Sequence, residues 1–559
     1  MAALRGVTVL RSIRWARRVS QTIFLSFFLL ASLHIGRLAL PLAGHAWPAA
    51  IPRLLFQLDP LAGILGALGR HGLVSGFWWI LIFLLGTLIA GRFFCGWLCP
   101  LGTLNQLFSR LRFFGKRGKQ SVERNNYRAA QKTKYYILLA GLLAALAGSS
   151  ILGWLDPLAI VQRSVGFAVW PAAHQASDAI VQTTASISGR NVGTGIRIEW
   201  NHTYLGAHLA VYRQNLGIAL LFLAILLANA YITRFWCRVL CPLGALLGTV
   251  SRFSILRLKK DEERCNKCQS CMLHCQGGDQ PRPGLPWRKS ECHLCLNCVN
   301  ACPTNCLSFE VVKPQALVPA ASTPDLNRRA VVTSAAAGLV VLPVLRTTTS
   351  SGAVLDAHLI RPPGAAGESD FLSRCIRCGN CMRACPTNAL QPALLEGGIE
   401  GLWTPVLAPR IGYCSPECTT CTEVCPTGAI ERLTAQQKGW AEPRQASTQP
   451  VRLGTAFYDY GRCLPWASGV ECSFCEKACP VTPKAIYFET AEFVKRTGET
   501  VSVNRPRIDL ARCIGCGACE HFCVLRDQPA ISVSRIGESR AGKDGLIVNG
   551  VDLTRSGRV

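Results

Sequence analysis

Apolar residues gather in four long runs in the first half of the chain, at 23–43, 73–91, 136–154 and 216–232. The shortest run has 17 residues, and a helix needs about 20 apolar residues to cross the hydrocarbon core of a bilayer. A signal peptide would also place basic residues before an apolar run, but three further runs follow the first. Residues 1–255 are therefore predicted to form an α-helical membrane domain with four spans.

Basic residues lie beside these runs. Residues 1–20 carry five arginines and no acid, and the loop between the second and third runs is strongly basic, whereas the loop from 154 to 213 is nearly balanced. The positive-inside rule then predicts a multi-pass protein of the bacterial cytoplasmic membrane, with the N-terminus, the basic loop and the end of the fourth run in the cytoplasm. The domain that follows the fourth run, residues 256–312, is therefore predicted to be cytoplasmic. The net charge of +27 could indicate nucleic acid, but its placement beside apolar runs argues against nucleic acid as a partner.

The predicted membrane domain contains an internal repeat. The segment 92–102, with Cys95 and Cys99 before Pro100, recurs as 234–244, with Cys237 and Cys241 before a second proline. An Asp-Pro-Leu-Ala sequence that begins at Asp59 recurs at Asp156. Both copies run in the same direction, which is typical of a parallel repeat.

Each C-x3-C-P motif places two thiols on one face of a helix, because residues i and i+4 are neighbours there. A redox or metal role for Cys95, Cys99, Cys237 and Cys241 is one interpretation. Helix-end packing, with proline ending the helix, is the alternative. The repetition favours a functional role.

Residues 256–312 carry two copies of the spacing C-x2-C-x2-C-x3-C. This spacing is typical of a two-cluster ferredoxin, in which the fourth cysteine of each motif ligates the other cluster. A zinc site would need only two C-x2-C pairs. We expect one [4Fe–4S] cluster on Cys265, Cys268, Cys271 and Cys302, and another on Cys292, Cys295, Cys298 and Cys275.

Residues 313–360 are predicted to be a linker. Arg328 and Arg329 precede a mildly apolar run at 330–345, which is similar to a twin-arginine export signal. This segment either forms a fifth span that exports the rest of the chain or packs as a helix, with everything after it still in the cytoplasm. We favour export, which places the C-terminal domain in the periplasm.

Residues 361–559 carry four more cysteine quartets and are predicted to form a four-cluster ferredoxin domain of the α+β type. The quartets are Cys375, Cys378, Cys381 and Cys385; Cys414, Cys418, Cys421 and Cys425; Cys463, Cys472, Cys475 and Cys479; and Cys513, Cys516, Cys519 and Cys523. Nested pairing, first with fourth, and sequential pairing, first with second, both fit these spacings. The six quartets use 24 of the 29 cysteines, and Cys306 belongs to none of them.

The C-x3-C-P motifs followed by two ferredoxin motifs resemble the NapH family of membrane iron–sulfur subunits, which is related to MauN and to the membrane core of NosR. The quartets after residue 327, with Arg361-Pro-Pro-Gly364 before them, resemble the NapG and MauM ferredoxins. The resemblance implies a fusion of two proteins that are otherwise separate. The wider second quartet departs from the NapG pattern.

The NapH-like resemblance implies quinol oxidation, with six [4Fe–4S] clusters passing electrons to a c-type cytochrome or a periplasmic oxidoreductase. Buried ionisable residues near a span suggest proton handling. The candidates are His34, Arg37, Asp59 and Asp156. Interfacial arginine and helix capping by Asp-Pro turns are the alternatives. A different class of function, maturation of a metalloenzyme, also occurs among relatives of both halves.

Overall fold

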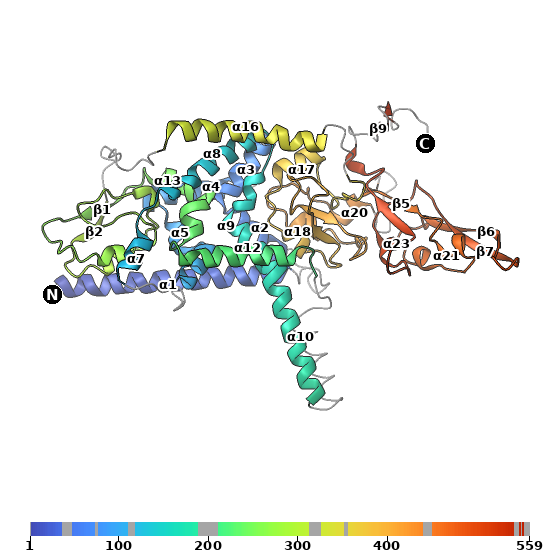
Figure 1. The fold of residues 1–559 in the computed structure, drawn as a ribbon, viewed down its shortest axis with the longest axis horizontal. Coiled ribbons are helices and arrows are strands. Elements are labelled where there is room, and N and C mark those ends of the chain that lie inside the picture. The colour runs from blue at the N-terminus through green and yellow to red at the C-terminus, as the bar shows by residue number, and fades with distance from the viewer. Residues whose placement is uncertain are drawn as a thin grey trace.

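The computed structural model describes residues 2–35, 47–72, 76–109, 118–187, 211–311, 326–350, 356–439, 450–541, 547–548 and 551–552. Figure 1 shows three parts arranged along the longest axis. A bundle of helices from the first half of the chain occupies the middle, the module around β1 and β2 lies at one end, and the C-terminal module lies at the other.

The described helices of the helical body, residues 2–251, range from 5 residues in α5 to 34 residues in α1. They are α1 (Ala2–Ile35), α2 (Trp47–Gln57), α3 (Pro60–Arg70), α4 (Phe77–Ala90), α5 (Phe93–Trp97), α6 (Pro100–Phe108), α7 (Lys119–Asn125), α8 (Thr133–Leu146), α9 (Pro157–Ser164), α10 (Trp170–Ile187), α12 (Asn215–Leu227) and α13 (Pro242–Ser251). The π-helical turns η4 (Val165–Val169) and η7 (Trp236–Leu240) interrupt them.

The internal repeat sets four of the helix starts. Asp59, Cys99, Asp156 and Cys241 are the N-caps of α3, α6, α9 and α13, and each precedes a proline at the first helical position. Proline is favoured there because its missing N–H would have no partner in the helix. Each cap side chain accepts a backbone N–H of the first turn, so the two copies fold alike.

The predicted four-span membrane domain is wrong. Among the described helices, none is both long and apolar enough to cross a bilayer alone, although one bent pair, Ala50–Gln57 with Pro60–Arg70, meets the length and composition together across an 86° break. The 14 residues of α4 rise about 21 Å, whereas the hydrocarbon core is about 30 Å thick. The runs at 136–154 and 216–232 continue beyond the ends of α8 at Leu146 and α12 at Leu227, so their length in sequence overstates the length of these helices.

The expected fifth span also has a different structure. α16 (Arg328–Ser350) is a helix of 23 residues that lies along α8 (Figure 1, yellow). A Cβ atom on Gly338 would come within 2.4 Å of the Ala140 carbonyl oxygen, so the two helices touch through their backbones. This segment packs as a helix, which is the alternative to a span.

The first ferredoxin module is small. β1 (Leu256–Lys260) pairs antiparallel with β2 (Leu307–Val311), with Leu258 opposite Phe309. The short helices α14 (Ser270–Leu273) and α15 (Asn297–Asn300) carry the cysteine loops. Two quartet cysteines, Cys271 and Cys298, belong to its small buried core, together with Cys306, Leu258 and Leu307, so thiols occupy space that apolar side chains would otherwise fill.

The C-terminal module repeats this design on a larger scale. Its strands form antiparallel pairs: β3 (Leu390–Pro392) with β4 (Pro405–Leu407), β5 (Thr455–Tyr458) with β8 (Ile531–Ser534), and β6 (Ile486–Val494) with β7 (Thr500–Ile508). Short helices stand between them: α17 (Glu368–Arg374), α18 (Asn380–Arg383), α19 (Thr420–Glu423), α20 (Ala435–Lys438), α21 (Leu464–Ala467), α22 (Phe474–Lys477) and α23 (Ala518–His521).

Both modules dock on the helical body through glycine contacts. A Cβ atom on Gly96 would lie 2.1 Å from the His293 carbonyl oxygen of the first module. A Cβ atom on Gly153 would lie 2.7 Å from the Ile376 carbonyl oxygen of the C-terminal module. Since only glycine permits these approaches, Gly96 and Gly153 let the two modules pack directly on the backbone of the helical body.

Candidate functional site

The first module gathers its eight motif cysteines into two groups. Burial raises the pKa of the Cys271 thiol to about 11, and the neighbouring thiols that raise it further are those of Cys302, Cys265 and Cys268. Burial likewise raises the pKa of the Cys275 thiol well above its usual value. The nearby thiol of Cys295, which belongs to the other motif, raises it further. Each motif therefore gives its fourth cysteine to the other group.

The first two quartets of the C-terminal module exchange ligands in the same way. Burial raises the pKa of Cys381, and its thiol neighbours are Cys378, Cys375, Cys425 and Cys421. The thiol neighbours of the buried Cys421 are Cys414, Cys418 and Cys385. Cys425 thus joins the first quartet, and Cys385 joins the second.

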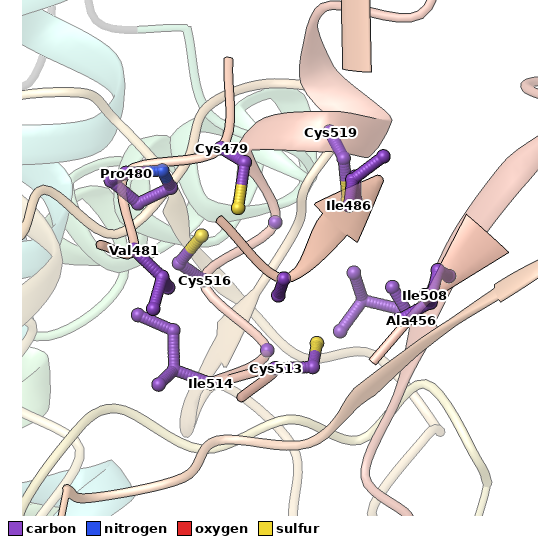
Figure 2. A pocket seen from close by; sticks show the side chains of 14 residues that line it. Ala456, Cys479, Pro480, Val481, Ile486, Ile508, Cys513, Ile514, Cys516 and Cys519 are labelled. Atoms are coloured by element: carbon purple, nitrogen blue, oxygen red, sulfur yellow. The ribbon is translucent and has the colours of Figure 1, made fainter. Parts of the chain in front are cut away.

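Each of the last two quartets surrounds a hollow. Cys479 lines the first together with Cys513, Cys516 and Cys519. Figure 2 shows the sulfur atoms of Cys479, Cys513 and Cys516 turned into one space beside Pro480 and Val481. Cys463, Cys472, Cys475 and Cys523 line the second hollow. Pairing in this module is therefore sequential.

These groups fit an iron–sulfur cluster. Four thiols face an apolar hollow at its corners, and thiolates are the ligands that hold such clusters. In the described part of the chain, no three His, Cys, Asp or Glu side chains converge closely enough to hold a single metal ion. Thiols set apart in this way suit a cube whose own sulfide ions fill the space between the iron atoms.

Two cluster neighbours were missed in the sequence. The Lys438 ammonium group, fully buried, lies 3.5 Å from Cys414 Sγ and donates to the Ser415 and Cys418 carbonyl oxygens. The Tyr458 hydroxyl lies 3.2 Å from Cys475 Sγ. Neither residue lies in a cysteine motif, and only the capping box that begins at Thr434 signals the helix that positions Lys438.

The two C-x3-C-P motifs meet inside the helical body. All four cysteines of these motifs are buried: Cys95, Cys99, Cys237 and Cys241. Burial raises the pKa of the Cys241 thiol, and the nearby thiols of Cys237, Cys95 and Cys99 raise it further. Cys99 Sγ accepts the Gly102 N–H at 3.4 Å, and Cys241 Sγ accepts the Gly244 N–H at 3.2 Å. The structure thus brings the two predicted pairs together as one centre of four thiols, called the four-thiol centre below.

Buried cations surround the four-thiol centre. Arg92 Nη1 donates to the Ser290 carbonyl oxygen at 2.9 Å and lies 3.7 Å from Glu291. Glu291 also pairs with Lys134. Burial lowers the pKa of Lys134 to about 8 although Glu291 opposes this, and the pKa of Glu291 falls because both cations outweigh its burial. His293 is buried beside these groups, and its two ring nitrogens have no hydrogen-bond partner among the described residues.

Asp59 and Asp156 lie face to face in the helical body. Both are almost completely inaccessible to solvent, at 0% and 1%. Burial raises the pKa of both carboxyl groups, and the nearby charge of Asp156 helps to raise that of Asp59 well above its usual range. Asp59 Oδ2 and Asp156 Oδ1 have no hydrogen-bond donor among the described residues. Since two buried like charges this close repel each other, we expect the pair to keep one proton.

The other predicted proton-handling residues give less information. Arg37 lies outside the described residues, and His34 lies in α1 but its side chain is outside the described part. The structure therefore brings Asp59 and Asp156 together and leaves His34 and Arg37 as predictions.

The comparisons with known proteins point to iron–sulfur domains along the chain. The description "4Fe-4S binding domain" matches residues 72–119 and 214–260, residues 285–308 and 371–391, and residues 510–523. No solved structure matches this chain. The prediction of [4Fe–4S] ferredoxin domains is confirmed.

Several curated relatives are ferredoxin-type proteins. The methylamine utilization ferredoxin-type protein MauM of Methylorubrum extorquens is 35% identical over 218 residues, which cover 37% of this chain and 88% of MauM. The ferredoxin-type protein NapG of Escherichia coli is 38% identical over 176 residues, covering 31% of this chain and 69% of NapG. The putative electron transport protein YccM of Escherichia coli is 26% identical over 273 residues, covering 46% of this chain and 64% of YccM. The fusion to a NapH-like part is not confirmed by these relatives.

Proposed function

Because this chain belongs to the family of the ferredoxin-type proteins MauM and NapG, we propose that it carries electrons from a quinol, through six [4Fe–4S] clusters, to a c-type cytochrome or a periplasmic oxidoreductase. The chain is an iron–sulfur electron-transfer protein of the ferredoxin type. The donor, the acceptor and the number of clusters are the new parts of this proposal.

The contact between the two cluster pairs of the C-terminal module is the observation that carries it. Within each pair, exchange of the fourth cysteine sets the two clusters side by side. Between the pairs, the Cys414 N–H donates to the Cys516 carbonyl oxygen at 2.9 Å, and each residue belongs to a different pair. The four sites therefore form a continuous series, as a path for electrons requires.

The Asp59–Asp156 pair supports a quinol as the donor. Oxidation of a quinol to a quinone releases two electrons and two protons, and the clusters accept electrons only. A carboxyl pair that keeps one proton can accept one of these two protons, and the other leaves to the solvent. Arg163 lies between this pair and the first C-terminal quartet, because it is a charged neighbour of Asp156 and donates to the Arg377 carbonyl oxygen at 3.1 Å.

The proposal also includes a location at the bacterial cytoplasmic membrane, where quinols are dissolved. Apolar side chains are exposed along α4 and α12, including Trp78, Ile82, Leu85, Leu216 and Leu220. Such surfaces suit contact with lipid. The acceptor named above requires that the C-terminal module faces the periplasm, and protease digestion of residues 360–559 in intact spheroplasts tests this.

The test of function is anaerobic mixing of the oxidised holoprotein with a water-soluble quinol analogue. We expect the visible absorbance of the oxidised clusters to bleach, and Asp156→Asn to slow the bleaching while dithionite still reduces the same clusters. Clusters that dithionite reduces and the quinol analogue leaves oxidised would contradict the proposal. Such a result would favour the alternative, a maturation factor for a metalloenzyme.

A further inference from the structure

The four-thiol centre has no role in the proposed path through the ferredoxin modules. Each segment of the helical body that matches a 4Fe-4S binding domain, 72–119 and 214–260, contains only two cysteines. Neither segment alone completes a quartet. The fold brings the two pairs together, because the thiols of Cys237 and Cys95 both lie near the buried thiol of Cys99 and interact with it electrostatically.

The four cysteines are held by equivalent backbone in the two repeats. Cys95 lies in the short helix α5 and Cys237 in the π-helical turn η7, while Cys99 and Cys241 cap the helices that follow. The two cap thiols each accept one backbone N–H. Such N–H···S bonds stabilise a thiolate and are among the features that tune protein-bound clusters.

Arginines of the two repeats cross over the centre. Arg234, from the second repeat, donates to the Cys95 carbonyl oxygen of the first at 2.9 Å. Arg92, from the first repeat, lies within 2.7 Å of the position of a Cβ atom on Gly244 of the second, and its Nη2 lies 3.9 Å from Cys95 Sγ. Each repeat therefore places an arginine against the other, and the charge of Arg234 acts on the Cys99 thiol while Arg92 interacts with the Cys241 thiol.

These cations lack sufficient negative charge around them. Arg92, Arg234 and Lys134 are all 0% exposed, and among the described residues Glu291 is the carboxylate that contacts Arg92 and Lys134. Uncompensated buried charge is costly. Four thiolates around an iron–sulfur core carry a net negative charge, since the thiolates and sulfides outweigh the iron, and would supply the missing balance.

From this arrangement we propose that Cys95, Cys99, Cys237 and Cys241 ligate one further iron–sulfur cluster inside the helical body. A single ion is disfavoured because the thiols do not converge on one point, and the ferredoxin quartets share this property. Both [2Fe–2S] and [4Fe–4S] clusters are held by four cysteines, and the experiment below distinguishes them.

The position of this cluster gives it a role. Gly96, next to Cys95, packs on His293, which follows the ligand Cys292 of the first module. Cys95, Cys99 and Cys241 share one buried core with Ile376 and Cys378 of the C-terminal module. The cluster would therefore stand between the two ferredoxin modules. This role rests on the proposed function, whereas the cluster itself does not.

Iron and acid-labile sulfide per chain test the site directly. Anaerobically reconstituted wild-type protein is compared with the Cys99→Ala/Cys241→Ala variant and with Cys306→Ala, which removes a buried thiol outside every quartet. We expect the double variant to lose about two iron atoms for a [2Fe–2S] cluster or about four for a [4Fe–4S] cluster. Cys306→Ala should keep the wild-type amount, and ⁵⁷Fe Mössbauer spectra should identify the cluster lost.

The proposal would be overturned if the wild-type protein and a folded double variant contained the same number of iron atoms per chain. Two findings on the wild-type holoprotein would also overturn it. One is disulfide bonds among the four cysteines, and the other is a single zinc ion bound by these cysteines where the iron–sulfur cluster is proposed. If the double variant fails to fold, the wild-type count decides: fully loaded protein with no more than the roughly 24 iron atoms of six cubes excludes a further cluster. None of these measurements depends on a quinol, so the site and the proposed function can fail separately.

Discussion

Asp59 and Asp156 begin equivalent helices of the two repeats, and their carboxyl groups lie close together in the interior of the helical body. Asp59 Oδ1 accepts the Leu61 N–H and Asp156 Oδ2 accepts the Ala159 N–H. One oxygen of each carboxyl group is thus used in a helix cap, and the other, Asp59 Oδ2 or Asp156 Oδ1, has no hydrogen-bond donor among the described residues. We expect these two oxygens to share one proton.

Asp59→Asn should make the helical body more stable at neutral and higher pH. The folded-state pKa of Asp59 is raised, so its contribution to stability is complete below the unfolded value of 3.8 and is lost as the pH rises through the folded value. Asparagine caps helices as well as aspartate does and donates to Asp156 without a titrating proton. Thermal unfolding from pH 4 to 9 should show a flatter profile for the variant.

Asp459 provides the control for this experiment. It is exposed and caps a turn by accepting the Gly461 N–H at 3.0 Å. Asp459→Asn should leave the pH profile unchanged. A wild-type profile for Asp59→Asn as well would show that the two carboxyl groups do not share a proton.

Glu368→Gln should destabilise the C-terminal module. Burial opposes ionisation of Glu368, but Arg361 at 2.5 Å and Arg540 at 3.4 Å lower its pKa to about 2. The resulting stability is present above the unfolded value of 4.5 and is lost as the pH falls towards 2, and it amounts to about 3 kcal/mol. Denaturant unfolding at pH 7 and pH 3 measures both the loss and its disappearance in acid.

A surface pair serves for comparison. Glu431 is mostly exposed and lies 3.7 Å from Arg374, and exposed pairs contribute under about 1 kcal/mol. If Glu431→Gln and Glu368→Gln have equal effects at pH 7, the buried ion pair beside Arg361 does not stabilise the module as stated.

Gly96→Ala should loosen the first ferredoxin module from the helical body. The new methyl group would lie 2.1 Å from the His293 carbonyl oxygen, and overpacking of this kind costs about 1–3 kcal/mol. Limited proteolysis should cut the variant between the helical body and residue 265 sooner than wild type. Gly217→Ala, on the exposed face of α12 with no heavy atom within 4 Å, should resist the protease as wild type does or better, since alanine favours helix.

Cys479→Ser should expose the cysteines of the last quartet, not those of the second. Cys479 lines the same hollow as Cys513, Cys516 and Cys519. Native-state alkylation followed by mass spectrometry should label these three cysteines in the variant, while Cys421 stays protected. Labelling of the second quartet instead would support the nested pairing.

Tyr458→Phe should make the reduction potential of one cluster more negative. The hydroxyl lies 3.2 Å from Cys475 Sγ, and hydrogen bonds to cluster sulfurs set the potential, because they stabilise the more negative reduced state. Redox titration followed by EPR measures the change. Tyr460 stacks beside Tyr458 and is half exposed, so Tyr460→Phe should keep the wild-type potential, and equal shifts in both variants would exclude the hydrogen bond as the cause.

The cysteine spacing predicted the ferredoxin modules because cluster ligation is encoded locally, within a few residues. Pairing across quartets needs the tertiary fold, which is why the exchange between Cys425 and Cys385 could not be read from the chain. The sequence could not predict the role of Lys438 for the same reason, because its ammonium group contacts Cys414 from a helix outside the motif.

Hydropathy misled the prediction of four spans. The run at 136–154 counts apolar residues on both sides of a turn, because the helix inside it ends at Leu146. In the run at 73–91, α4 covers only Phe77–Ala90. The repeat, by contrast, was informative: its Asp-Pro and Cys-Pro pairs mark four helix starts, and the two aspartates meet. Whether Asp59 and Asp156 handle protons in turnover stays a prediction, as do the roles of His34 and Arg37.

Sequential exchange of cysteines has a consequence for biogenesis. By the time Cys425 has left the ribosome, all eight ligands of the first C-terminal cluster pair exist. A nested arrangement would have kept the first cluster open until Cys523 was synthesised. Each cluster pair of this module can therefore be assembled independently, as soon as its own eight cysteines have been synthesised. The thiols of the first pair then spend less time without metal, which reduces their oxidation.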